Sequence, residues 1–363
     1  MSFKLYGFGV ESISAESLGE RIDYGVKMVG APLEWEETDG GRGVPVGIID
    51  TGVEYDHEDL SGAVTENRDF TDAGETRPRD ENGHGTHVAG IIAARRNGVG
   101  VIGVAPECRV YSARAFEPDG SANIDAVTRA LEWLIDENVD VINMSFSAAR
   151  STKRFASLIR EAYERGICLV SAAGNDGEGD NIIGCPARFE ECIAVTAVDI
   201  DKKHAPFSTG GKKAEVCAAG TNIYSCYKGN AYAVLSGTSM ATPVITGAIA
   251  LLQAKARRRY GRRLTPAEVR LLLHMYAEKL GAGGRDENFG YGLFTFDRLY
   301  YDAAKESYVA ASSKIANRGD IADVYAASLA PKARGRKKSA ENTISGALLS
   351  AFLLEKKRRF MVK

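Results

Sequence analysis

Short apolar runs alternate along this chain with longer segments of helical periodicity. Continuous apolar runs, typical of strands buried on both faces, occur at 44–49, 109–116, 139–144, 168–172, 192–198 and 214–218. Apolar positions spaced three and four apart predict helices at 82–96, 122–136 and 152–165, and a capping box from Thr265 to Glu268 opens another. The polar stretch 54–81 is expected to be a loop. This alternation predicts an α/β fold, a mainly parallel sheet with helices on both faces.

The composition is that of a globular protein with a substantial core. With 363 residues and 44% hydrophobic content, the chain is long enough for one α/β domain with terminal additions. No run approaches the roughly 20 apolar residues that a membrane span needs, and no signal-peptide stretch is visible at the start. The six cysteines form no CxxC pair and are expected to be reduced core thiols, so we expect a cytoplasmic protein.

Four polar residues stand where predicted elements begin or end. Asp50 closes an apolar run, His84 lies between glycines, Asn175 follows the break in AAGN, and Ser239 opens the last long helix. A histidine can accept the proton of an attacking serine, and a buried carboxylate can orient and stabilise the imidazolium. An amide donor can stabilise the oxyanion together with the serine N–H. Taken alone the serine is equally suited to an ordinary N-cap, but the order Asp, His, Ser is one that catalytic triads use.

Four sequence blocks, IIDTGV, NGHGTHVAG, AAGN and SGTSMATP, make the chain resemble the subtilases, or subtilisin-like serine proteases, over about residues 24–291. The resemblance implies a subtilisin-like fold and an endopeptidase that cleaves polypeptides through an acyl-enzyme. It implies Asp50, His84 and Ser239 as the triad and Asn175 as the oxyanion donor. In organisation the chain is most similar to bacterial intracellular subtilisins. The rival hypotheses are an inactive protein with this fold and a binding protein that acts through its basic tail.

The same resemblance implies that a substrate lies as an added strand between two backbone segments. These segments are Gly120, Ser121 and Ala122 on one side and Ser145, Phe146 and Ser147 on the other. The first specificity pocket is implied to be lined by Ser147, Ala172, Gly174 and Gly184. Ser147 and Ala148 stand where the family commonly has glycines, and Ala122 where glycine is frequent, so a narrowed or reshaped pocket is expected.

A structural calcium site is also implied. Its ligands correspond to the side chains of Glu20, Asp59 and Asn97 and to the carbonyl groups of Arg95, Val99 and Val101. The alternative is a surface loop without an ion. The glycine pattern at 98–103 matches GxGxxG, but the required strand and helix are missing around it, which argues against a nucleotide site. His87 is expected to be a packed structural residue.

Residues 24–300 are therefore expected to form the catalytic domain, with an extension at 1–23 and another at 301–363. In intracellular subtilisins a short extension occupies the cleft until it is clipped, and we expect residues 4–10 (KLYGFGV) to do so here. The proline-containing motif of such extensions is missing, and a frayed terminus is the alternative. Residues 301–363 carry 13 Lys or Arg against 6 Asp or Glu. A solvated tail or a helix that packs in a homodimer is favoured there over nucleic-acid binding.

Overall fold

The largest sheet has nine strands, in the order β13-β14-β10-β9-β8-β7-β3-β5-β4. Neighbouring strands run parallel except for β13 and β14. In that order the strands span Ala277–Glu278, Leu293–Phe294, Val216–Ala219, Cys192–Val198, Cys168–Ala172, Val141–Met144, Pro45–Asp50, Arg109–Arg114 and Val64–Asp69. The structure is a computed structural model that describes residues 2–5, 9–14, 19–71, 73–74, 78–177, 182–282 and 284–297. The predicted extension at 301–363 lies outside these residues.

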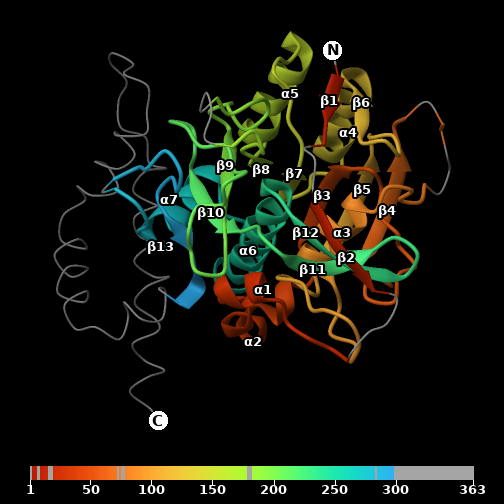
Figure 1. Ribbon diagram of the computed structural model, residues 1–363, viewed down its shortest axis with the longest axis horizontal. Helices are drawn as coiled ribbons and strands as arrows, with labels where there is room; N and C mark the ends of the chain where they lie inside the picture. The colour runs from red at the N-terminus through yellow and green to blue at the C-terminus, as the bar shows by residue number, and fades with distance from the viewer. Residues whose placement is uncertain are drawn as a thin grey trace. The chain divides into compact units, whose positions relative to one another are not determined.

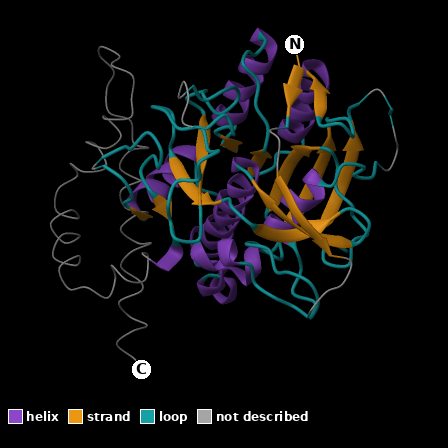
Figure 2. Ribbon diagram, in the orientation of Figure 1, coloured by secondary structure: helices purple, strands orange, loops and turns teal. Residues whose placement is uncertain are grey.

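Helices cover both faces of this sheet (Figures 1 and 2). Ile142 of β7 packs in one apolar cluster with residues of α4 (Ile124–Asp136) and α5 (Lys153–Glu164). The next residue, Asn143, points to the opposite face, where Thr246 of α6 (Thr238–Tyr260) donates a hydrogen bond of 2.9 Å to its side-chain oxygen. The other helical segments are α1 (Tyr24–Met28), α2 (Trp35–Thr38), α3 (His84–Ala93), α7 (Pro266–Met275), η1 (Ala31–Leu33) and η2 (Asp39–Gly41). The predicted α/β fold is confirmed.

Local capping explains where several helices begin and end. The predicted capping box is present at the start of α7, where the side chains of Thr265 and Glu268 each accept from the other's backbone. Asn123 caps α4, so that helix starts two residues later than its periodicity predicts. Gly261 ends α6 in the left-handed conformation that glycine adopts without strain.

Two smaller sheets lie beside the main one. In the first, β1 (Ser2–Lys4) pairs with β6 (Ser121–Asn123), and in the second the strand order is β11-β12-β2. The latter strands span Ile223–Tyr227, Ala231–Ser236 and Gly9–Ser14. The prediction of a loop over residues 54–81 is wrong because it contains β4, an edge strand whose outer face is solvated and therefore lacks an apolar run.

All six cysteines are free and buried, as predicted. Burial raises the pKa of each thiol, to about 12 for Cys108 and Cys168. They act as small apolar side chains of the core. None of the helices within the described ranges combines the length and apolar character required to cross a bilayer.

Candidate active site

Asp50 and His84 form a buried acid–histidine pair. Asp50 is the last residue of β3, at the carboxyl edge of the sheet, and His84 is the first residue of α3. The distance between Asp50 Oδ1 and His84 Nδ1 is 2.7 Å, and the side chains are 1% and 0% exposed. The Thr51 N–H also donates to Asp50 Oδ1, at 2.8 Å. The histidine is thus held in one orientation, with its other ring nitrogen directed away from the carboxylate.

Ser239 is the second residue of α6, and this helix packs against α3. Its hydroxyl donates to the carbonyl of Ser145 at 3.0 Å, and the Ser145 hydroxyl donates in return to the carbonyl of Ser239, also at 3.0 Å. That carbonyl would normally accept the N–H of residue 243, but Pro243 has none. Because of the proline, the Ser239 carbonyl can accept from the Ser145 hydroxyl, and this hydrogen bond connects α6 to the residue that follows β7.

Asn175 lies directly beside the start of α6. Its side-chain oxygen accepts from the backbone N–H of Thr238 at 2.9 Å and from the Thr238 hydroxyl at 2.8 Å. This use of the oxygen fixes the orientation of the amide, so its NH₂ group is the donor end. A Cβ added to Gly237 would lie 3.0 Å from that nitrogen. The Asn175 NH₂ group therefore lies near Gly237, two residues before Ser239.

Asp80 supports the histidine loop and was not anticipated from the sequence. Its buried carboxylate accepts from the Thr51 hydroxyl at 2.8 Å and from the N–H groups of Asn82 and Gly83, at 3.0 and 2.8 Å. The N–H and hydroxyl of Thr86 complete the set, at 2.8 and 2.7 Å. Burial raises the pKa of this carboxyl. Asp80 thus holds the turn before α3 to the residue that follows Asp50.

The two predicted substrate edges hold the protein's own N-terminal strand. Ser2 to Lys4 pair antiparallel with Asn123 to Ser121, and the Leu5 N–H donates to the Gly120 carbonyl at 3.0 Å. On the other side, Lys4 and Ser147 exchange two backbone hydrogen bonds of 3.2 Å each. The strand β1 therefore bridges both edges in the manner of an added strand.

Phe3 anchors this strand. Its side chain is 0% exposed and contacts the ring of Phe146 edge-on, with centroids 5.1 Å apart, and that of Phe155 at 5.3 Å. Ala122 and Ile124 belong to the same apolar cluster. The inhibitory segment predicted from the sequence begins at Lys4 and so leaves out this anchor.

Ser147 and Gly184 meet at the predicted specificity pocket. The Ser147 hydroxyl lies where a Cβ on Gly184 would stand, so only glycine fits at that position. Ala172 ends β8 and Gly174 follows with a φ of 125°, a conformation that favours glycine. The Ser147 side chain thus lies directly beside Gly184, and a reshaped specificity pocket stays a prediction.

Three of the predicted calcium ligands, Glu20, Asp59 and Asn97, form hydrogen bonds at the loop of residues 97–101. The Asn97 amide and the Val101 N–H donate to the two oxygens of Asp59, at 3.1 and 2.8 Å. The carboxylate of Glu20 accepts from the Gly98 N–H at 2.8 Å. Two carboxylates and an amide around a loop backbone are a donor set that suits a hard cation, provided that the Asn97 amide rotates to present its oxygen. The Arg95 side chain points elsewhere, to the carbonyls of Gly62 and Pro106.

A second group of metal-ligating types, His57, Asp59 and Cys226, is buried beside this loop. The Asp59 N–H donates to His57 Nδ1 at 3.1 Å, and His57 Nε2 donates to the carbonyl of Ala231 at 2.9 Å. Both ring nitrogens are therefore used within the fold. Burial raises the pKa of the Cys226 thiol, which disfavours the thiolate. These residues are better explained as packing around Asp59 than as a transition-metal site.

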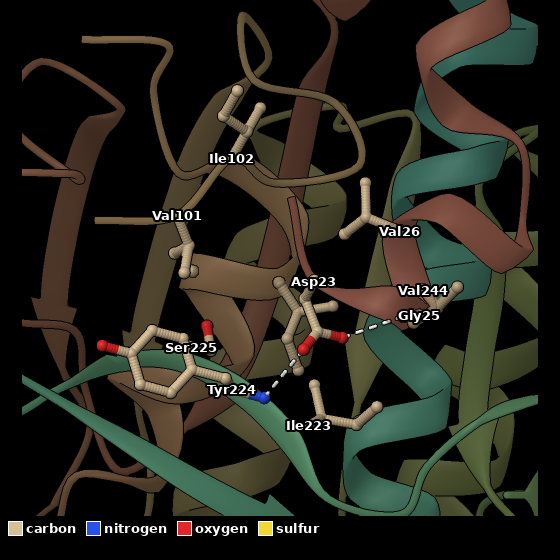
Figure 3. A pocket seen from close by; sticks show the side chains of 11 residues that line it. Asp23, Gly25, Val26, Val101, Ile102, Ile223, Tyr224, Ser225 and Val244 are labelled. Carbon is tan, nitrogen blue, oxygen red and sulfur yellow. Dashed lines mark hydrogen bonds between the residues drawn. The ribbon is translucent and has the colours of Figure 1, made fainter. Parts of the chain in front are cut away.

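Asp23 fixes the chain that follows Glu20. In the small pocket of Figure 3, its carboxylate accepts from the N–H groups of Gly25, at 2.8 Å, and Tyr224, at 3.2 Å. The guanidinium of Arg21 lies over the Tyr224 ring, 3.1 Å from its centroid. These contacts attach the segment that enters the catalytic domain to β11, independently of β1 and β2.

His87 is a structural histidine, as expected. Its ring is 0% exposed, and Nε2 lies 3.0 Å from the Ile223 carbonyl and 3.1 Å from that of Ala233. Carbonyl oxygens accept only, so Nε2 carries the proton. Burial lowers the pKa of His87 to about 3, which keeps the ring neutral.

A buried acid–histidine pair at the carboxyl edge of a parallel sheet, in a fold whose longest described helix has a serine in its first turn, is consistent with a hydrolytic α/β enzyme. The model of the Subtilase family matches residues 41–292. The "Intracellular serine protease" of Paenibacillus polymyxa is 36% identical over 312 residues, which cover 84% of this chain and 93% of that protein. "Subtilisin DY" of Bacillus licheniformis is 39% identical over 275 residues, or 75% and 96% of the two chains. "Subtilisin E" of Bacillus subtilis (strain 168) is 36% identical over 244 residues, or 66% and 63%.

The chain belongs to the subtilase family. It is a subtilisin-like serine endopeptidase, and its substrates are polypeptides.

Proposed function

We propose that this endopeptidase cleaves peptide bonds through Ser239, His84 and Asp50. The observation that carries the proposal is the 2.7 Å contact between Asp50 and His84 at the same sheet edge as the Ser239 helix start. In this proposal the Ser239 hydroxyl rotates to another staggered rotamer, away from the Ser145 carbonyl and toward the imidazole of His84. His84 accepts its proton as the oxygen attacks the substrate carbonyl.

The remaining steps follow from the same groups. The tetrahedral oxyanion accepts from the Asn175 NH₂ group and from the Ser239 N–H at the positive end of the α6 dipole. The imidazolium is stabilised by Asp50, and the burial of this pair strengthens the interaction. His84 then protonates the leaving amine, and it later activates the water that hydrolyses the acyl-enzyme.

We further propose that the described chain is a latent form. A strand that pairs antiparallel with 145–147 advances toward Ser145 as it continues beyond the residue opposite Ser147. The Ser145 carbonyl accepts from Ser239, so β1 lies in the direction and register of the acyl-donating half of a substrate. Ser239 and His84 are both 0% exposed. Because β1 occupies both proposed substrate edges, a substrate binds there only when the N-terminal segment leaves, which makes the extension an inhibitor.

Calcium is proposed as a structural ion at the loop of residues 97–101. Asp59, Asn97 and Glu20 would hold it with their side chains, together with backbone carbonyls of the loop. When bound, the ion would neutralise carboxylates that otherwise repel each other, and so fix the loop to β12 and to the segment before α1. It takes no part in the reaction.

An intracellular site of action is proposed from two observations. The Paenibacillus relative carries that word in its name, and all six thiols are free in the described fold. The proposed homodimer and the weaker alternative of nucleic-acid binding both concern residues 301–363, which lie outside the described residues.

The test uses the full chain with residues 15–18 replaced by the recognition site of a sequence-specific protease. A fluorophosphonate probe should label this protein only after the site is cut and the N-terminal fragment is removed. The same protein with Ser239→Ala should stay unlabelled. Equal labelling before and after cutting would disprove latency. A cut, folded protein that is never labelled would disprove the catalytic assignment.

A further inference from the structure

The edge of β12 is covered by β2. The two strands pair antiparallel from Gly9 opposite Ser236 to Ser14 opposite Tyr232, with a bulge at Glu11, between the pairs of Val10 with Leu235 and of Ser12 with Val234. β11 occupies the other edge of β12, so β2 is the outer strand of this three-stranded sheet. When the extension leaves, the described sheet presents the N–H and C=O groups of β12 as an open edge, which is a ready template for another extended chain.

One side chain of β2 is held by specific polar contacts. The Ser236 hydroxyl donates to Glu11 Oε1 at 2.7 Å and accepts from the Asn222 N–H at 2.8 Å, so its proton is directed at the carboxylate. With its amide nitrogen turned toward Glu11, the Asn222 side chain donates to both carboxylate oxygens. By contrast, Val10 and Ile13 are 44% and 58% exposed. This edge therefore binds one acidic side chain specifically, whereas the side chains at positions 10 and 13 face solvent.

The direction of the chain assigns the edge to one half of a substrate. A polypeptide that enters along β1 passes Ser147 and then Ser145, whose carbonyl marks the position of Ser239. β12 ends at Ser236, three residues before Ser239. A chain that continues in the same direction reaches β12 only after it has passed the nucleophile. The residues at this edge are thus those on the amine side of the cleaved bond.

We propose that the β12 edge, once vacated by β2, binds the part of a polypeptide substrate downstream of the cleaved bond, and that Ser236 and Asn222 select an acidic residue there. This inference rests on the proposed function. In the extension, Glu11 lies seven residues after Lys4, which is opposite Ser147. In a bound substrate, the residue that takes the place of Lys4 lies opposite Ser147. The residue that donates the acyl group comes two positions later, opposite Ser145. The preferred acid therefore lies about five residues downstream of it.

Binding is tested without catalysis, in the full chain that carries Ser239→Ala and the cleavable site at 15–18, after cutting and removal of the fragment. The probe is a fluorescent peptide of residues 7–14, GFGVESIS, followed by anisotropy. We expect saturable binding that weakens at least fivefold when the peptide glutamate becomes glutamine. The matched control changes the peptide isoleucine, whose counterpart Ile13 is exposed, to glutamine and should bind equally well. Absence of binding, or equal loss with both peptides, would overturn the proposal.

The protein side is tested with Ser236→Ala, which should bind the glutamate and glutamine peptides equally. Ser61→Ala, an exposed serine, should keep the discrimination. If Ser236→Ala does not fold, the peptide comparison on the unchanged residues still decides the question.

With Ser239 intact, quenched peptides with eight downstream residues should show kcat/KM at least tenfold above those with two. Equal values would refute downstream docking. If no peptide is hydrolysed, the proposed catalysis fails, while the binding assay still supports or overturns the docking of the downstream residues.

Discussion

Lys4 and Ser147 exchange two backbone hydrogen bonds, and this pair fixes the N-terminal strand in the register of a bound peptide. A neighbouring strand, β6, completes the clamp through Ser121. The geometry that would orient a substrate for cleavage thus holds the N-terminal strand of the chain itself.

Replacement of Phe3 by alanine should release latency. Truncation of a fully buried phenylalanine typically costs about 3 kcal/mol or more, which shifts the docked fraction by a factor of about 100. We expect the intact Phe3→Ala chain to hydrolyse a fluorogenic peptide at least tenfold faster than the unmodified chain. Ile13→Ala, at an exposed position of β2, is the control and should leave the rate unchanged. Unchanged activity in Phe3→Ala would show that β1 does not limit access.

Asp80→Ala should impair both stability and turnover. Loss of the carboxylate leaves buried donors of Thr51, Gly83 and Thr86 without their acceptor, which costs roughly 1–3 kcal/mol for each such group. Because the turn before His84 loosens, kcat should fall more than KM rises. Urea unfolding and steady-state kinetics of the activated enzyme measure the two effects. A loss of stability with kcat intact would limit Asp80 to a structural role.

Pro243→Ala restores an N–H that competes for the Ser239 carbonyl. The first turns of α6 should become more regular, which raises stability by up to about 3 kcal/mol. The link from the Ser145 hydroxyl is weakened, so kcat should fall severalfold while KM stays constant. Pro266→Ala, at the first turn of α7 where proline removes no helical bond, is the matched control. A fall in stability with unchanged kcat would contradict this account of Pro243.

Removal of calcium should lower thermal stability if the ion binds at Asp59. An ion present at a thousand times its Kd contributes about 4 kcal/mol. We expect EGTA to lower the Tm of the unmodified protein, and Asp59→Asn to have a lower Tm that EGTA no longer changes. Asp56→Asn removes a nearby exposed carboxylate paired with Arg79 and should retain the full EGTA response. An EGTA response that survives in Asp59→Asn would place the ion elsewhere.

His87 should make stability fall in acid. Its pKa is about 3 when folded and 6.5 when exposed, so between these values the unfolded chain binds one more proton. This contribution is complete above pH 6.5 and declines by about 1.4 kcal/mol per pH unit as the pH falls below it. In His87→Gln the slope of unfolding free energy against pH, measured in urea from pH 7 to 5, should be smaller by that amount. An unchanged slope would exclude His87 as its source.

The sequence alone predicted six buried strands of the main sheet and placed the four proposed chemical residues beside the ends of predicted elements. Buried strands such as 168–172 and 192–198 are apolar throughout, and glycine-rich blocks place Asp50, His84 and Ser239 at element ends. β4 and β2 escaped prediction because one side of each faces solvent or a polar partner, which leaves no apolar period to detect. The contacts of Asp80 with Thr51 and of Glu11 with Ser236 join residues far apart in the sequence, and composition carries no record of them.

The six buried cysteines make opening of the folded core measurable by thiol labelling. A thiol with a pKa near 12 is almost never ionised at neutral pH, and alkylating reagents attack the thiolate. In the native protein these thiols should not react with alkylating reagents or with mild oxidants. Alkylation of a cysteine then requires that the core opens, so the rate of alkylation measures how often the core around the sheet opens.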